Sequence, residues 1–98
     1  MYDRTDDILL HYEWDPSKAK ANRAKHGVAF VDAIAVLENE HSVTAPGDAI
    51  GECRRASIGL DALGRTLTVI WTWRGECVRI ISARRATASE RAAMKWKR

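Results

Sequence analysis

Arginine dominates the charged residues in the second half of this 98-residue chain. Residues 51–98 hold eleven Lys and Arg against four Asp and Glu, whereas residues 1–50 hold five against nine. Nine of the eleven cations are arginines, whose planar guanidinium groups bind phosphate oxygens at two points. The net charge of +3 therefore hides a strongly basic half. Such a half indicates a polyanionic partner, and nucleic acid is the first candidate.

Three arginines are candidates for a phosphate clamp, namely Arg55, Arg79 and Arg84. Strict alternation places Arg79 in the middle of a strand and Arg84 at its end on the opposite face, with Arg55 at the start of a neighbouring strand. In the alternative interpretation these arginines are solvated charges that pair with nearby acids, such as Glu52, Glu76 or Glu90.

His26 is the best candidate for general acid–base work, because an unperturbed imidazole titrates near neutral pH. The alternative is a structural His26 that bonds the last carbonyls of a helix. Lys25, Arg65 and Arg85 are further candidates for contacts with nucleic acid. Trp73 could stack on a base or belong to the core.

Composition excludes several other classes of function. The histidines are scattered and Cys53 and Cys77 lack CxxC spacing, so we expect no metal site, no cofactor and two reduced thiols. There is no glycine-rich phosphate loop, and no apolar run is long enough for a membrane span. The acidic N-terminus does not resemble a secretory signal, which favours a cytoplasmic protein.

The elements that would position these side chains form one α+β domain over residues 1–98, with residues 1–7 frayed. Asp15 and Pro16 are typical of a helix start, and Gly27 of a helix end. The expected order is a strand at 8–14, helices at 16–26 and from 30, a short edge strand near 43, strands at 54–60, 65–73 and 76–84, and a final helix from 89. We therefore expect two N-terminal helices on one face of a meandering antiparallel sheet, with a C-terminal helix, in the order β-α-α-β-β-β-β-α.

Four strings within residues 12–92 form a specific pattern. They are Trp14-Asp15-Pro16-x-Lys18-x-x-x-Asn22-x-x-Lys25-His26-Gly27-Val28-x-Phe30, Arg54-Arg55-x-x-Ile58-Gly59, Gly64-Arg65-x-Leu67-x-Val69, and Arg79-Ile80-Ile81-Ser82-Ala83-Arg84-Arg85-Ala86-Thr87 followed by Glu90-Arg91. Together they resemble the BrnT family of toxins. The resemblance implies a RelE-like fold and a type II toxin–antitoxin module. It also implies metal-independent RNA cleavage that inhibits translation, and neutralisation by a BrnA-type antitoxin through which alone operator DNA is bound.

RNA carries its own nucleophile, the 2′-OH beside the scissile phosphate. A protein that cleaves it must align this oxygen, move two protons and stabilise the added negative charge, and fixed arginines suit the last task. On this interpretation Arg55, Arg79, Arg84 and His26 are catalytic, while Lys25, Arg65, Trp73 and Arg85 bind RNA.

Two residues depart from the family pattern. Ala29 stands where a capping Ser, Thr or Asp usually opens the second helix, and Met94 stands where the family often has tyrosine. The loss of tyrosine favours a second hypothesis, a non-catalytic module that binds nucleic acid or a partner and acts as a co-repressor. A third is an interaction domain whose basic face meets an acidic protein. Trp96 in the basic tail is a candidate antitoxin contact.

Overall fold

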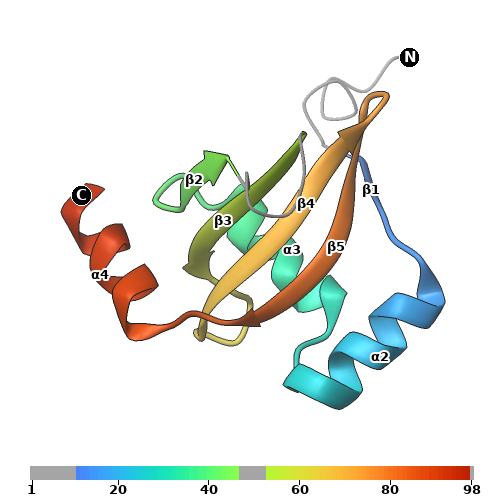
Figure 1. Cartoon of the computed structure of the whole chain (residues 1–98), viewed down its shortest axis with the longest axis horizontal. Helices are drawn as coiled ribbons and strands as arrows, with labels where there is room; N and C mark the ends of the chain where they lie inside the picture. Colours follow the sequence, from blue (N-terminus) through green and yellow to red (C-terminus); the bar gives the residue numbers. More distant parts are fainter. Residues whose placement is uncertain (1–10, 47–52, 98) are drawn as a thin grey trace, which may run out of the picture.

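The computed structural model describes residues 11–46 and 53–97, and shows five strands and three helices in this part of the chain (Figure 1). Their order is β-α-α-β-β-β-β-α, as predicted from the sequence. The elements are β1 (His11–Glu13), α2 (Pro16–His26), α3 (Phe30–Glu38), β2 (Val43–Pro46), β3 (Arg54–Leu60), β4 (Thr66–Arg74), β5 (Cys77–Arg85) and α4 (Ala88–Lys97). Residues 1–7, expected to be frayed, lie outside the described residues, as does most of the segment after Pro46.

The strands form one mixed sheet in the order β1-β5-β4-β3-β2. The prediction of an all-antiparallel meander was wrong at one edge, because β1 pairs with β5 in parallel. The other three pairings are antiparallel. A parallel neighbour needs a crossover rather than a hairpin, and here the chain from β1 to β5 passes through both helices and three strands. The parallel register places Glu13 opposite Arg79.

A β-bulge at Ile81 changes which side chains of β5 share a face. Ile80 pairs with Trp71 and Ser82 pairs with Ile70, so Ile81 has no partner. Strict alternation predicted Arg79 and Arg84 on opposite faces, and this was wrong. The extra residue shifts the alternation by one, so that Arg79 and Arg84 lie on the same face.

Helix α2 has the ends that the sequence predicts. The Asp15 carboxylate accepts a hydrogen bond from the Ser17 backbone N–H at 2.8 Å, and Pro16 occupies the first turn. Gly27 adopts a left-handed conformation with φ of 71° and donates its N–H to the Arg23 carbonyl. The Asn22 amide is buried and binds the backbone N–H and C=O of Ala83 at 3.1 and 2.8 Å, which fixes α2 against β5.

The core lies between α3 and one face of the sheet, and α3 crosses behind β3, β4 and β5 (Figure 1). The helix contributes Phe30, Ala33 and Val36, which are almost fully buried, while Ile34 and Leu37 pack at the margin. The sheet contributes Leu67, Val69, Trp71, Val78, Ile80 and Ala83.

Helix α4 begins with a reciprocal capping box. The Glu90 backbone N–H donates to the Thr87 hydroxyl at 3.2 Å, and the Thr87 N–H donates to a Glu90 carboxylate oxygen at 2.8 Å. Elsewhere the helix has few contacts and extends away from the sheet (Figure 1). No described helix is long and apolar enough to span a membrane.

Candidate functional site

Neighbouring arginines in the sequence are divided between the two faces of the sheet. Arg55 and Arg85 share the face of the core residues Trp71 and Leu67, which α2 and α3 cover. Arg54 and Arg84 lie on the opposite face, with Arg79. Apart from the start of α4 and the start of α2 at its margin, no described element covers this opposite face, which we call the open face.

A row of polar side chains crosses four strands on the open face. Glu13, Arg79, Thr72 and Arg54 are successive cross-strand partners in β1, β5, β4 and β3. Directly opposed side chains in a sheet lie about 5 Å apart at their Cβ atoms, so the row is continuous. The sequence order separates these residues by up to 66 positions, but the register brings them together.

This row forms one side of a cleft of about 230 Å³, which we call the arginine cleft. Its lining comes from the row, the bulged segment of β5 and the first turn of α2, namely Asp15, Lys18, Arg54, Thr72, Arg79, Ile80 and Ile81. Asp15 is engaged as the helix cap. Lys18 is exposed, and within the described residues neither it nor Arg54 makes an ion pair.

Glu13 is the carboxylate shared by two arginines beside the cleft. Its Oε2 atom accepts a hydrogen bond from Arg79 Nη1 at 2.9 Å and lies 3.5 Å from Arg74 Nε. The Glu13 side chain is one-third exposed, so an incoming anion can reach its ion pair with Arg79. Cations thus outnumber carboxylates around the cleft, which suits a phosphate group.

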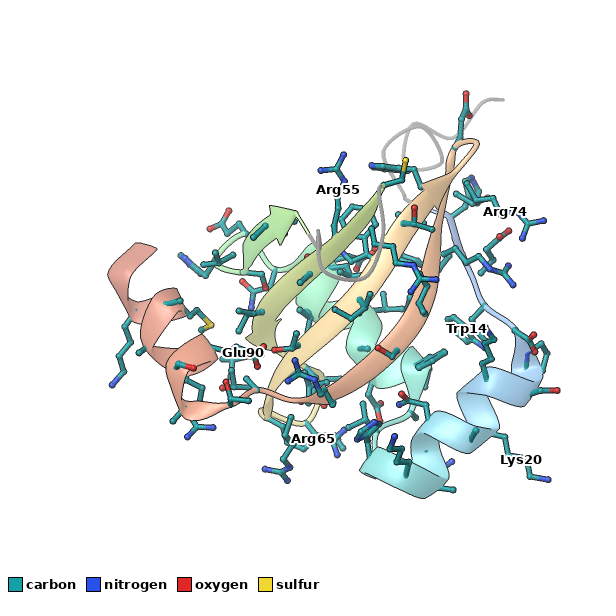
Figure 2. All side chains as sticks on the ribbon, viewed as in Figure 1. Trp14, Lys20, Arg55, Arg65, Arg74 and Glu90 are labelled. Atoms are coloured by element: carbon teal, nitrogen blue, oxygen red, sulfur yellow. The ribbon has the colours of Figure 1, made fainter. Side chains whose placement is uncertain are left out.

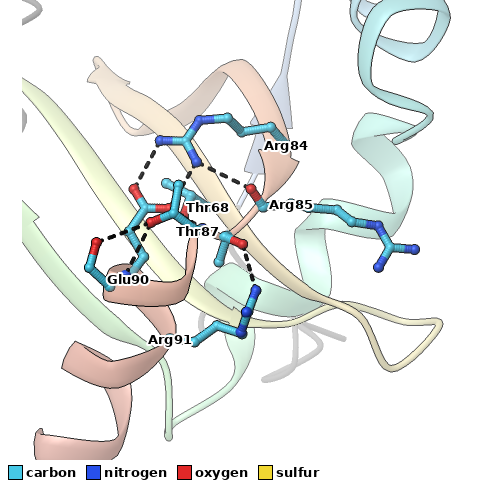
Figure 3. Close-up of polar contacts among 8 residues, drawn as sticks. Thr68, Arg84, Arg85, Thr87, Glu90 and Arg91 are labelled. Atoms are coloured by element: carbon cyan, nitrogen blue, oxygen red, sulfur yellow. Dashed lines mark hydrogen bonds and ion pairs between the residues drawn. The ribbon is translucent and has the colours of Figure 1, made fainter.

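Arg84, which also lies on the open face, is held by Glu90 in a bidentate ion pair (Figure 3). The two bonds measure 2.8 and 2.9 Å, and Glu90 also accepts from the Thr68 hydroxyl at 2.8 Å. The bond from Arg84, with those from Thr87 and Thr68, outweighs burial and lowers the pKa of Glu90 to about 2. The same bond raises the pKa of Arg84. This pair fastens α4 to the sheet, while the side chain of Arg85 points away from it (Figure 3).

The prediction that Arg55, Arg79 and Arg84 converge was therefore wrong. Arg55 stands on the covered face, with its guanidinium carbon 5.9 Å from the centre of the Trp71 ring. Trp73 lies on that face as well, packed edge-on against Trp71 at 5.5 Å and 47% exposed. Neither residue lines the arginine cleft. The alternation of side chains within one strand does not show which face of the sheet a helix will cover, or how that strand is aligned with its neighbours.

Arg65 was expected to bind RNA, but the structure gives it a different task. Its guanidinium lies 2.7 Å from Asp61 and 3.9 Å from Asp32, and donates to the Gly27 carbonyl at 3.1 Å. It joins the end of α2, the start of α3 and the β3–β4 turn. Arg55 and Arg65 lie at opposite ends of the sheet (Figure 2). Arg65 is mostly buried, which leaves little of it for a ligand.

His26 and Lys25 lie at the far end of α2 from the cleft. Lys18 and His26 are eight residues apart, which is about 12 Å along a helix. His26 is half-buried as the last helical residue, and Lys25 is exposed. This placement separates His26 from the arginine cleft, so its expected role as the general acid–base group stays a prediction.

Sequence reasoning missed Arg54, Lys18 and Glu13. Both Arg54 and Lys18 belong to strings that carry the family resemblance, but only the strand pairing distinguishes the face of Arg54 from that of Arg55. Glu13 had no signal in the sequence, because only the parallel pairing of β1 with β5 brings it to Arg79. The side chain of Trp96, the candidate antitoxin contact, lies outside the described residues. The described residues hold no group of His, Cys, Asp and Glu side chains that could bind a metal ion.

Comparison with known proteins identifies similar chains. Residues 14–90 match the family described as "Ribonuclease toxin, BrnT, of type II toxin-antitoxin system". The structure is similar to the crystal structure of the ribonuclease toxin BrnT from Brucella abortus, with a TM-score of 0.66 and 28% sequence identity. The alignment covers 81% of this chain and 99% of that chain. A comparison with curated protein sequences gives no match.

Proposed function

The chain belongs to the BrnT family of type II toxin–antitoxin ribonuclease toxins, and from this premise we propose that it cleaves RNA at the arginine cleft without a metal ion. On this proposal it acts in the cytoplasm as a single domain over residues 1–98 and inhibits translation by destroying RNA. A BrnA-type antitoxin neutralises it, and operator DNA is bound only through the complex. We propose on the same ground that the fold is RelE-like.

The cleft offers the groups that RNA cleavage needs. Arg79 and Arg54 bind the non-bridging oxygens of the scissile phosphate and stabilise the charge that builds on them. When the phosphate engages Arg79, the Glu13 carboxylate loses its hydrogen-bonded partner and becomes free to act as a base. Glu13 thus replaces His26 as the proposed general base.

The proposed reaction balances without any added reactant. Glu13 removes the proton from the 2′-OH, and the 2′-oxygen forms a bond to phosphorus. The bond from phosphorus to the 5′-oxygen breaks, and Lys18 at the cleft returns a proton to that oxygen. The products are a 2′,3′-cyclic phosphate and a 5′-hydroxyl.

The observation that carries this proposal is the meeting of Arg54, Arg79 and Lys18 in one cleft on the open face. Adjacent arginines provide a matched test, because Arg54→Ala and Arg55→Ala remove the same charge from opposite faces. We expect Arg54→Ala to abolish growth arrest and RNA cleavage in expressing cells, and Arg55→Ala to retain both. Equal losses in the two variants would contradict the assignment to the open face. Cleavage by the purified chain should also continue in excess chelator.

A second function, that of a non-catalytic nucleic-acid-binding co-repressor, is favoured by one observation. Arg79 and Arg84 are each bonded to a carboxylate, and such pairs compete with an incoming phosphate. If this function is correct, the purified chain will bind RNA in a salt-dependent manner and leave it intact. Recovery of full-length RNA after prolonged incubation would select it over the ribonuclease.

A further inference from the structure

A second cavity lies on another side of α2, between this helix and the start of α3. It has a volume of about 530 Å³ and an apolar lining, and we call it the α2–α3 groove. Its lining residues are Trp14, Ala19, Lys20, Arg23, Ala24, Ala29, Phe30 and Val31. The groove exists because alanines on α2 are too small to fill the space beside the Trp14 and Phe30 rings, which pack edge-on at 5.8 Å. Val31 remains 62% exposed at this site, so the apolar lining of the groove is open to solvent.

The charge around the groove is positive. Helix α2 contains Lys18, Lys20, Arg23 and Lys25 but no acidic residue, and none of these cations makes an ion pair with a described residue. Helical periodicity places Lys20 and Arg23 three residues apart on one side, and both line the groove. Lys18 instead lines the arginine cleft (Figure 2 labels Lys20 and Trp14 for orientation).

The first turn of α3 adds to this positive charge. Ala29 caps the helix without a side-chain hydrogen bond, so no cap side chain offsets the positive end of the helix dipole beside the groove. The acidic residue of this turn, Asp32, lies near Arg65 at 3.9 Å.

We propose that the α2–α3 groove is the docking site for an acidic amphipathic helix of the antitoxin. The apolar lining fits a row of apolar side chains at i, i+3 or i+4 and i+7, and the cations fit acidic residues that flank this row. RNA fits less well, because its phosphates gain nothing from Trp14, Phe30 and Val31. This inference rests on the toxin–antitoxin assignment of the family.

The groove and the arginine cleft share no lining residue. Antitoxin binding and RNA cleavage are therefore separable by mutation. A groove variant would stay toxic and escape neutralisation.

The test uses the full chain and the purified BrnA-type antitoxin of its own toxin–antitoxin pair as the probe. Two variants change the groove, Val31→Glu and the double variant Lys20→Glu with Arg23→Glu. Two matched controls change exposed residues elsewhere, Leu63→Glu for the apolar side chain and Lys95→Glu for the charge. Affinity is measured by calorimetry, folding by circular dichroism, and toxicity by growth with and without the antitoxin.

We expect each groove variant to raise the Kd for the antitoxin by at least about tenfold, to fold normally and to arrest growth despite co-expression of the antitoxin. The controls should bind and be neutralised like the wild type. Unchanged affinity in both groove variants would overturn the proposal, as would loss of RNA cleavage with antitoxin binding intact. Antitoxin binding by a wild-type chain that fails to arrest growth would support the docking site and refute the ribonuclease.

Discussion

The two ends of the sheet hold arginine in opposite ways. Just before β4, Arg65 is enclosed by Asp61, Asp32 and the Gly27 carbonyl, so an acceptor oxygen lies near each of its three guanidinium nitrogens. Around the arginine cleft, Lys18, Arg54, Arg74 and Arg79 share few carboxylates. The first arrangement stabilises the fold, and the second leaves positive charge available to a ligand. In this chain the function of an arginine follows from the balance of acceptors around it.

The largest expected effect comes from the enclosed end. Burial alone would raise the pKa of Asp61, but its bonds from Arg65 and from the Leu63 and Arg65 backbone N–H groups outweigh this and lower it. Asp61→Ala would leave the mostly buried Arg65 without its main partner and lower the free energy of unfolding by about 3–5 kcal/mol. Urea denaturation measures this loss. A loss below about 1 kcal/mol would mean that the enclosed arginine is no more structural than the cleft.

The second-largest effect is expected at the arginine cleft, where a substitution lowers the rate of RNA cleavage and leaves the free energy of unfolding nearly unchanged. Arg79→Ala should slow RNA cleavage by about 10²–10³-fold, since it removes one electrostatic contact to the transition state. The free energy of unfolding should fall by less than about 1 kcal/mol, because the pair with Glu13 is partly exposed. Cleavage rates and urea curves are compared with those of Arg85→Ala, which removes an exposed arginine from the covered face. Equal rates of RNA cleavage in the two variants would contradict the assignment of the reaction to the open face.

The Arg84–Glu90 ion pair is intermediate between the enclosed Arg65 and the arginine cleft, and its contribution to stability depends on pH. The pKa of Glu90 is about 2 in the folded protein against an ordinary value of 4.5, so its ionised form favours the folded state. This stabilisation, about 2 kcal/mol after allowance for partial exposure, is present above pH 4.5 and is lost as the pH falls towards 2.

Glu90→Gln removes the ionised group and serves as the reference for this measurement. The difference in the free energy of unfolding between wild type and variant should be greatest at neutral pH and shrink as the pH falls from 5 to 3. A difference that stays constant over this range would show that Glu90 acts only as a helix cap.

The smallest expected effect is a gain in stability at the start of α3. Ala29→Ser would supply the side-chain oxygen that the start of α3 lacks and raise the free energy of unfolding by about 1 kcal/mol. Thermal denaturation measures the shift. Cleavage should not change, because Ala29 does not line the arginine cleft.

The local signals of the sequence predicted most of the fold. Asp15, Pro16 and Gly27 fix the ends of α2 through their own chemistry, and the alternation of Leu67, Val69 and Trp71 gives the buried face of β4. The order of elements and the strand 54–60 are confirmed. Some of the resemblance has a structural reason as well, since a side chain at Gly59 would collide with Ser42.

The site was less predictable because it depends on pairing between distant segments. The bulge at Ile81 reversed the relation between Arg79 and Arg84, and the parallel pairing of β1 brought in Glu13. An unpaired bulge residue has no fixed signature in a single strand, and two strands can be paired in more than one register. The sequence therefore indicates arginine as the functional residue type but does not identify which arginines meet.

The Asn22 amide has a consequence for solubility. Among residues 11–46 and 53–97, β1 pairs with only part of the outer margin of β5, and Asn22 binds the backbone groups of Ala83 farther along this margin. The opposite margin is the four-residue strand β2, which ends in a proline. Short strands, proline and a side-chain amide in place of a neighbour all oppose edge-to-edge aggregation.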